Sequence, residues 1–193
     1  TGMMPIWDGE IQISQPLMEQ IERMCLESGN LMMAALVISS GGEMLILQGQ
    51  LKEAEKQHQR ALALAVDPQG RRLPIAGNAL IGLGDLARER GEWQTAEELL
   101  LQAIELTRQW GQIGMLDSYI HLARLRQLRS DPDGAQKALD GAWQVAHASD
   151  LTNMDDLMVH VFRARLALAQ GDLAAAERWA AQYSQADILA AHN

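Results

Sequence analysis

The sequence has little of what disulfide-bonded, strand-rich or membrane-spanning proteins need. Its single cysteine, Cys25, excludes an internal disulfide and fits a reducing compartment. One phenylalanine, two tyrosines and a lack of alternating valine, isoleucine and threonine argue against a sheet protein. No apolar run approaches the ~18 residues of a membrane span. We therefore expect a cytoplasmic chain with no membrane partner and a buried Cys25 thiol.

Basic residues and catalytic groupings are also scarce. Sixteen lysines and arginines stand against 25 acidic residues, which gives a formal net charge of −9. Because phosphate contacts need a basic face, we expect no direct binding of nucleic acid. The sequence contains no Gly-x-x-x-x-Gly-Lys-Ser/Thr loop, no Ser/His/Asp or Cys/His constellation, and only dispersed histidines. We expect no catalytic residue, cofactor or metal in this segment, and no enzyme.

The sequence does contain four copies of a small-residue pattern typical of paired helices. A glycine or serine precedes an alanine by five residues at Gly49–Ala54, Gly91–Ala96, Ser130–Ala135 and Gly171–Ala176. Twelve residues before each alanine is another small residue, namely Gly42, Gly84, Ala123 or Ala164. Small residues at both positions let two helices approach closely. The repeat of about 41 residues predicts a solenoid of antiparallel helix pairs, with His58 facing the interior of the first pair.

We divide the chain into an N-terminal segment, four repeats and a tail. Residues 1–30 have no clear period at first, with a turn expected at Asp8-Gly9; Ser14 then caps a helix from about Gln15 to Glu27, from an incomplete preceding repeat. The repeats occupy 31–185, with helix pairs at 31–66, 74–110, 113–148 and 154–183, and residues 186–193 are expected to fray. Neither end has a polar capping helix. We therefore expect either an excised segment of a longer protein or a homo-oligomer whose end faces are buried by self-association.

Four phrases of the sequence carry a family resemblance. They are LILQGQLKEAEKQHQRALALA (Leu45–Ala65), LPIAGNALIGLGDLARERGEWQTAEELLLQAIELTRQWG (Leu73–Gly111), YIHLARLRQLRSDPDGAQKAL (Tyr119–Leu139) and RARLALAQGDLAAAERWA (Arg163–Ala180). In this order they resemble the tetratricopeptide sensor repeats of MalT-like, LuxR-type bacterial transcription regulators, over roughly residues 31–183. The resemblance implies an all-α, tetratricopeptide-like right-handed superhelix, with a repeat longer than the usual ~34 residues.

Members of that family are multidomain, ATP-dependent transcription activators. The resemblance implies that this chain is their effector-sensing and protein-interaction domain, which binds a small-molecule inducer or a protein partner in its concave groove. A P-loop ATPase module and a DNA-binding helix-turn-helix, both absent from this sequence, would act beside it in the same longer chain. The alternative is a general tetratricopeptide scaffold or adaptor that binds a peptide or protein.

The inner faces of the first helices supply the candidate ligand-binding residues. One row along these faces is Glu43, Asp85, Arg124 and Arg165, which forms either a ladder of ion pairs between repeats or a polarised binding site. Amide, carboxylate and guanidinium groups gather near the middle of the groove and suit a polar small molecule or peptide. The candidates are Asn78, Asp85, Arg88, Asp117, Arg124, Gln127 and Arg165.

Overall fold

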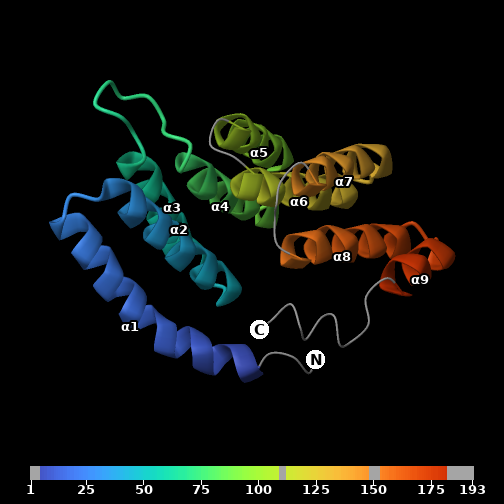
Figure 1. Ribbon diagram of the computed structural model, residues 1–193, viewed down its shortest axis with the longest axis horizontal. Helices are drawn as coiled ribbons and strands as arrows, with labels where there is room; N and C mark the ends of the chain where they lie inside the picture. Colours follow the sequence, from blue (N-terminus) through green and yellow to red (C-terminus); the bar gives the residue numbers. More distant parts are fainter. Residues whose placement is uncertain (1–4, 109–111, 148–152, 182–193) are drawn as a thin grey trace.

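The computed structural model describes residues 5–108, 112–147 and 153–181, which form helices joined by turns and loops (Figure 1). The helices are α1 (Pro5–Glu27), α2 (Leu31–Leu47), α3 (Leu51–Leu64), α4 (Ala76–Glu89), α5 (Trp93–Arg108), α6 (Gln112–Leu128), α7 (Pro132–His147), α8 (Asn153–Ala169) and α9 (Leu173–Ala181). Consecutive helices pack as the hairpins α2/α3, α4/α5, α6/α7 and α8/α9. In Figure 1 the hairpins follow one another in an arc, with α5 and α7 on its outer side.

The first helices of the hairpins form the inner layer of this arc. Helix α2 contacts α4, α4 contacts α6, and α6 contacts α8. Each of the second helices α3, α5 and α7 instead packs against the first helix of the next hairpin. We call the inner surface of α2, α4, α6 and α8 the concave groove.

The repeated small residues lie where the two helices of a hairpin approach most closely. Ala54, Ala96 and Ala135 are fully buried. A Cβ atom added to Gly84 on α4 would lie 3.0 Å from Cγ of Leu100 on α5, so any larger side chain would push these two helices apart. Leu100 itself belongs to the central apolar cluster, which joins the second and third hairpins.

A residue in the left-handed conformation ends the first helix of each hairpin. The φ angles are 74° at Gly49, 75° at Gly91, 58° at Ser130 and 78° at Gly171. The next N–H donates to a carbonyl five residues earlier, as in the 2.9 Å bonds from Glu92 to Ala87 and from Asp131 to Arg126. This is the Schellman termination, which favours glycine because glycine has no Cβ to clash in this conformation.

Ser130→Gly is expected to stabilise the protein by about 0.5–1 kcal/mol. Serine pays a steric cost for its positive φ that glycine avoids, although glycine also gains freedom in the unfolded chain. Urea unfolding would measure the difference. The reciprocal change Gly91→Ser, in the equivalent turn, should destabilise by a similar amount; a loss of stability in Ser130→Gly would show that the serine is not strained.

The N-terminal helix is longer than the sequence predicted. Helix α1 begins at Pro5, so the expected turn at Asp8-Gly9 and the expected cap at Ser14 both lie inside the helix. An α-helix can form without a periodic pattern of apolar side chains, because its hydrogen bonds join backbone groups. Pro16, inside α1, removes only one of these hydrogen bonds. The expectation of a buried Cys25 is also wrong, because this free cysteine is half-buried on α1.

The first helices of the four hairpins begin within two residues of the expected repeat limits at 31, 74, 113 and 154. The expected tail at residues 186–193, and the last residues of the second, third and fourth expected repeats, lie outside the described residues. None of the described helices is both long enough and apolar enough to cross a membrane.

Candidate functional site

A cavity of about 300 Å³ opens into the concave groove where α2, α4 and α6 meet. Helices α2 and α4 each contribute polar and apolar residues, and α6 contributes side chains of opposite charge. The lining residues are Glu43, Ile46 and Leu47 from α2, Asn78, Ile81, Gly82 and Asp85 from α4, and Asp117, His121 and Arg124 from α6. We call this hollow the groove cavity. Its volume lies at the lower end of the range of small-ligand pockets.

Two side-chain hydrogen bonds hold Asp85 in the groove cavity. Its side chain is buried, and its Oδ1 accepts hydrogen bonds from Nε of Arg88 at 3.1 Å and from Nδ1 of His121 at 2.8 Å. Burial by itself would raise the pKa of the Asp85 carboxyl, but the hydrogen bond and charge of His121, together with Arg88, lower this pKa well below its ordinary value. Asp85 is therefore an anion at neutral pH, and it links α4 to α6.

Three other residues of the groove cavity have side chains that the protein leaves unpaired. Within the described residues, Glu43, Asn78 and Arg124 make no side-chain hydrogen bond or ion pair. Glu43 is open to solvent at the mouth of the groove, yet the surrounding helices remove part of its hydration, and this burial, with the charges of Asp117 and Asp85, raises its pKa. Desolvation also lowers the pKa of Arg124, which remains a cation at neutral pH.

The structure brings four of the seven predicted site residues together and places three elsewhere. Asn78, Asp85, Asp117 and Arg124 line the groove cavity. Arg88 instead holds Asp85, and its Nη2 donates to Glu89 at 2.7 Å. Gln127 borders a separate hollow of about 10 Å³ near Phe162, and Arg165 is exposed with its guanidinium 5.4 Å from the centre of the Phe162 ring.

The described helices do not form the ion-pair ladder that was the alternative for the row Glu43, Asp85, Arg124 and Arg165. No ion pair joins two members of this row in the part of the chain that the structure describes. Asp85 pairs instead with His121 of the next repeat. The role of these residues in ligand binding stays a prediction.

Sequence reasoning missed His121 as a residue of the groove cavity. The signal was present, because His121 follows Asp117 by four residues and precedes Arg124 by three, which is the spacing of one helix face. The rows counted from the repeated small residues do not include His121.

His58 occupies an apolar position at the back of the groove cavity. Its imidazole is fully buried between Gly42 on α2 and Gly82 on α4, which confirms that it faces the interior. Neither ring nitrogen has a hydrogen-bond partner among the described residues. Burial lowers the pKa of His58 to about 4, against a smaller opposite influence of Asp85, so the ring is neutral at pH 7.

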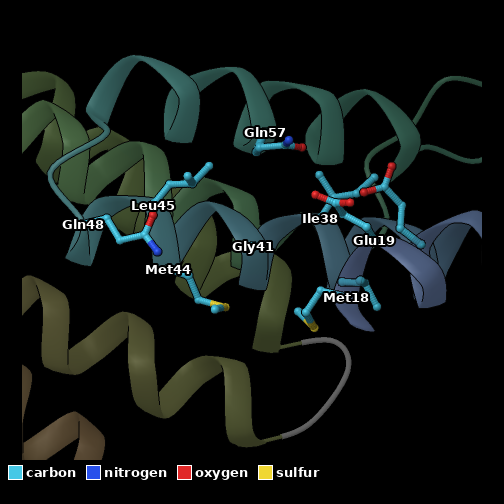
Figure 2. Close-up of a pocket in the computed structure, with 10 residues that line it drawn as sticks. Met18, Glu19, Ile38, Gly41, Met44, Leu45, Gln48 and Gln57 are labelled. Atoms are coloured by element: carbon cyan, nitrogen blue, oxygen red, sulfur yellow. The ribbon is translucent and has the colours of Figure 1, made fainter. Parts of the chain in front are cut away.

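A second hollow of about 80 Å³ lies between α1, α2 and α3 (Figure 2). Figure 2 shows Met18 and Glu19 reaching it from α1 and Gln57 from α3. The Oε1 atom of Gln57 is buried and has no hydrogen-bond partner within the described residues. A space this small suits about two or three waters that would satisfy this atom. We regard it as a gap in packing, and the groove cavity as the candidate site.

The described residues contain no group of three or more histidine, cysteine or acidic side chains placed to hold a metal ion. The chemistry that the groove cavity does offer is reversible recognition. Its carboxylates, amide and guanidinium suit hydrogen bonds and ion pairs with a polar ligand.

Solved structures that resemble the chain are helical repeat proteins. BtubC (BKLC) from P. vanneervenii matches with a TM-score of 0.67 and 16% identity, over 89% of this chain and 70% of that one. A Podosopora anserina protein with nearly identical TPR-like repeats, described as a kinesin light chain, matches with a TM-score of 0.57 and 20% identity, over 91% and 86%. PilW, a type IV pilus biogenesis factor, matches with a TM-score of 0.56 and 21% identity, over 95% and 80%.

These likenesses confirm the expected all-α, tetratricopeptide-like superhelical fold, while the repeat length of about 41 residues stays a prediction. Repeat domains of this type are generally non-catalytic and mediate protein interactions. No curated protein is significantly similar to the sequence. The family model of the MalT-like TPR region matches residues 1–192. The chain therefore belongs to the MalT-like family of tetratricopeptide-repeat domains.

Proposed function

We propose that this chain is the effector-sensing domain of a multidomain, ATP-dependent transcription activator in the cytoplasm. A small inducer binds in the groove cavity, and the repeat superhelix passes that event to a P-loop ATPase module and a helix-turn-helix in the same longer protein. Membership of the MalT-like family supports the regulatory context. The observation that carries the proposal is the groove cavity itself, about 300 Å³ in volume and lined by three helices from successive repeats.

The unpaired polar side chains of the groove cavity favour a ligand there over a purely structural role. Buried or half-buried polar groups that serve stability are normally satisfied within the protein. The half-buried Asn78 and Arg124 have no side-chain partner among the described residues, whereas Asp85 is held by two partners. A ligand that bridges α2, α4 and α6 would bind only the folded superhelix and would fix the relative position of three repeats.

A second candidate function is that of a general scaffold for a peptide or protein. The supporting observation is a set of exposed leucines near the ends of inner helices, namely Leu47 on α2, Leu128 on α6 and Leu168 on α8. Exposed apolar side chains in a series suit a partner protein. The two functions differ in what stabilises the domain, because only an effector domain responds to a small molecule.

A thermal-shift screen of sugars, amino acids and other small metabolites tests the proposal. A ligand that binds only the folded state raises the melting temperature as its occupancy increases. A hit must be weakened about tenfold by Arg124→Gln, since this change removes a charged hydrogen-bond donor from the groove cavity. Arg108→Gln is the matched control, because Arg108 is exposed on the outer helix α5. Equal affinities of the two variants would show that the ligand does not bind at Arg124 in the groove cavity.

Asp85 is a poor choice for the same experiment. Its removal would also leave Arg88 and His121 without their shared acceptor and would weaken the contact between α4 and α6. Reading the gene on both sides gives an independent check. A P-loop module upstream and a helix-turn-helix downstream support the regulator, and a stand-alone reading frame supports the scaffold.

A further inference from the structure

Three carboxylates line the groove cavity, from Glu43, Asp85 and Asp117, and both Arg88 and His121 hydrogen-bond to Asp85. The carboxylates of Glu43 and Asp117 lie close enough for their charges to repel: after burial, the charge of Asp117 is the largest influence that raises the pKa of Glu43. A ligand that carries an ammonium group would relieve the repulsion between the carboxylates, and an anionic ligand would increase it.

The unpaired charges also lie on opposite sides of the groove cavity. Glu43 projects from α2 and Arg124 from α6, and α4 lies between these two helices. The two side chains do not pair with each other. Packed helices have axes about 8–10 Å apart, and α4 lies between α2 and α6. One ligand must therefore extend across α4 to contact both Glu43 and Arg124. Such a ligand needs opposite charges at its two ends.

Apolar and amide groups occupy the space between those charges. Ile46 on α2 and Ile81 on α4 line the groove cavity, and Asn78 adds an unpaired amide. The isoleucines suit a short aliphatic stretch, and the amide suits a polar group along it. A neutral sugar has no charge to offer Glu43 or Arg124 and would leave both partly desolvated without a partner.

We propose that the groove cavity recognises a small amino compound with a carboxylate at one end and an ammonium group at the other, such as a basic amino acid or a short basic dipeptide. The carboxylate pairs with Arg124, the ammonium pairs with Glu43 next to Asp117, and the aliphatic part lies on Ile46 and Ile81. This inference rests on the proposed effector function and specifies the chemical class of the effector.

Calorimetric titration of the 193-residue chain with matched probes tests this class. L-Lysine, 6-aminohexanoate and glycyl-L-lysine carry both end charges. L-Lysinamide lacks the carboxylate, and Nε-acetyl-L-lysine lacks the terminal ammonium. A neutral disaccharide and glutarate represent uncharged and dianionic effectors. We expect at least one of the first three probes to bind about tenfold more tightly than both L-lysinamide and Nε-acetyl-L-lysine.

Two variants assign the ends of the ligand. Glu43→Gln should weaken a probe with both charges about tenfold and leave Nε-acetyl-L-lysine unaffected. Arg124→Gln should weaken the same probe about tenfold and leave L-lysinamide unaffected. Glu105→Gln and Arg108→Gln on α5 are the matched controls, because these residues form an exposed ion pair 3.5 Å long on the outer side.

The outcomes separate this inference from the effector function on which it rests. If the disaccharide, glutarate or another metabolite binds in an Arg124-dependent way and the amino probes do not, the effector groove stands and the amino class is overturned. If an amino probe binds equally well to the groove variants and the controls, the assignment to this cavity is overturned. If neither these probes nor the wider metabolite screen gives a ligand, both proposals fall.

Discussion

Gly82→Ala is expected to destabilise the protein by about 2–3 kcal/mol, although it adds only one methyl group. The added Cβ would lie 2.1 Å from Cε1 and 2.2 Å from Nε2 of His58, far inside van der Waals contact. The imidazole cannot move aside, because Gly42 packs against it from α2 and the ring is fully buried. Helix α4 must therefore shift away from α3. For a chain of this size the melting temperature should fall by roughly 4–12 °C.

Gly41→Ala is the matched control for this substitution. Gly41 also lies inside a helix, but an added Cβ there would meet no atom within 4 Å. Alanine is a better helix former than glycine, so Gly41→Ala should be neutral or stabilise by up to about 1 kcal/mol.

A double-mutant cycle with His58→Ala isolates the clash at Gly82. His58→Ala leaves a cavity and destabilises by itself, yet it also makes room for the new methyl group. Gly82→Ala should therefore cost much less in the His58→Ala background than in the wild type. Equal costs in both backgrounds would show that the loss arises from α4 alone.

The sequence predicted the hairpins well because their close approach depends on local small residues. Gly84 meets Leu100, and Ala96 and Ala135 are fully buried, as the repeated pattern implied. It did not reveal the tight fit of Gly82, because this glycine contacts a side chain of the preceding repeat and has no counterpart in the pattern. A contact between repeats depends on their relative rotation, which a periodic spacing does not contain.

The candidate site was predictable only in part for the same reason. Asn78 and Asp85 reached the groove cavity because they lie on the inner face of α4. Arg165 did not, although it has the same offset in its repeat, because the fourth hairpin turns it toward Phe162 and solvent. Offsets place residues on a face of one helix, and the curvature of the superhelix decides which faces converge.

His58 also differs from its counterparts in a way that carries a chemical consequence. The equivalent residues, four positions after the repeated alanine of the next two hairpins, are Leu100 and Leu139, and both are buried. The first repeat thus holds a titratable ring where the next two hold leucine. Neither nitrogen of that ring is hydrogen-bonded within the described residues, so its protonation inside the fold is opposed by desolvation alone, with only the charge of Asp85 in favour.

The protein is therefore expected to lose about 3 kcal/mol of stability through His58 as the pH falls from 7 to 4. Its pKa is about 4 in the folded state, against 6.5 in an unfolded chain. The unfolded state binds a proton below pH 6.5 that the folded state refuses until about pH 4, so stability is full above pH 6.5 and decreases through this interval. The lowered pKa of Asp85 acts below its ordinary value of 3.8, outside this range.

His58→Leu isolates this contribution, since leucine fills the equivalent position in the next two repeats. The measurement is the urea midpoint of both proteins at intervals between about pH 4 and 7.5. Glu43 has a raised pKa, so the folded state retains its proton more tightly, and its contribution to stability falls as the pH rises past 4.5, opposite in sign to that of His58. Both proteins contain Glu43, and the difference between their curves therefore reports His58. Parallel curves would mean that the buried imidazole accepts a proton as readily as it does in water, which would require a partner for one of its nitrogens.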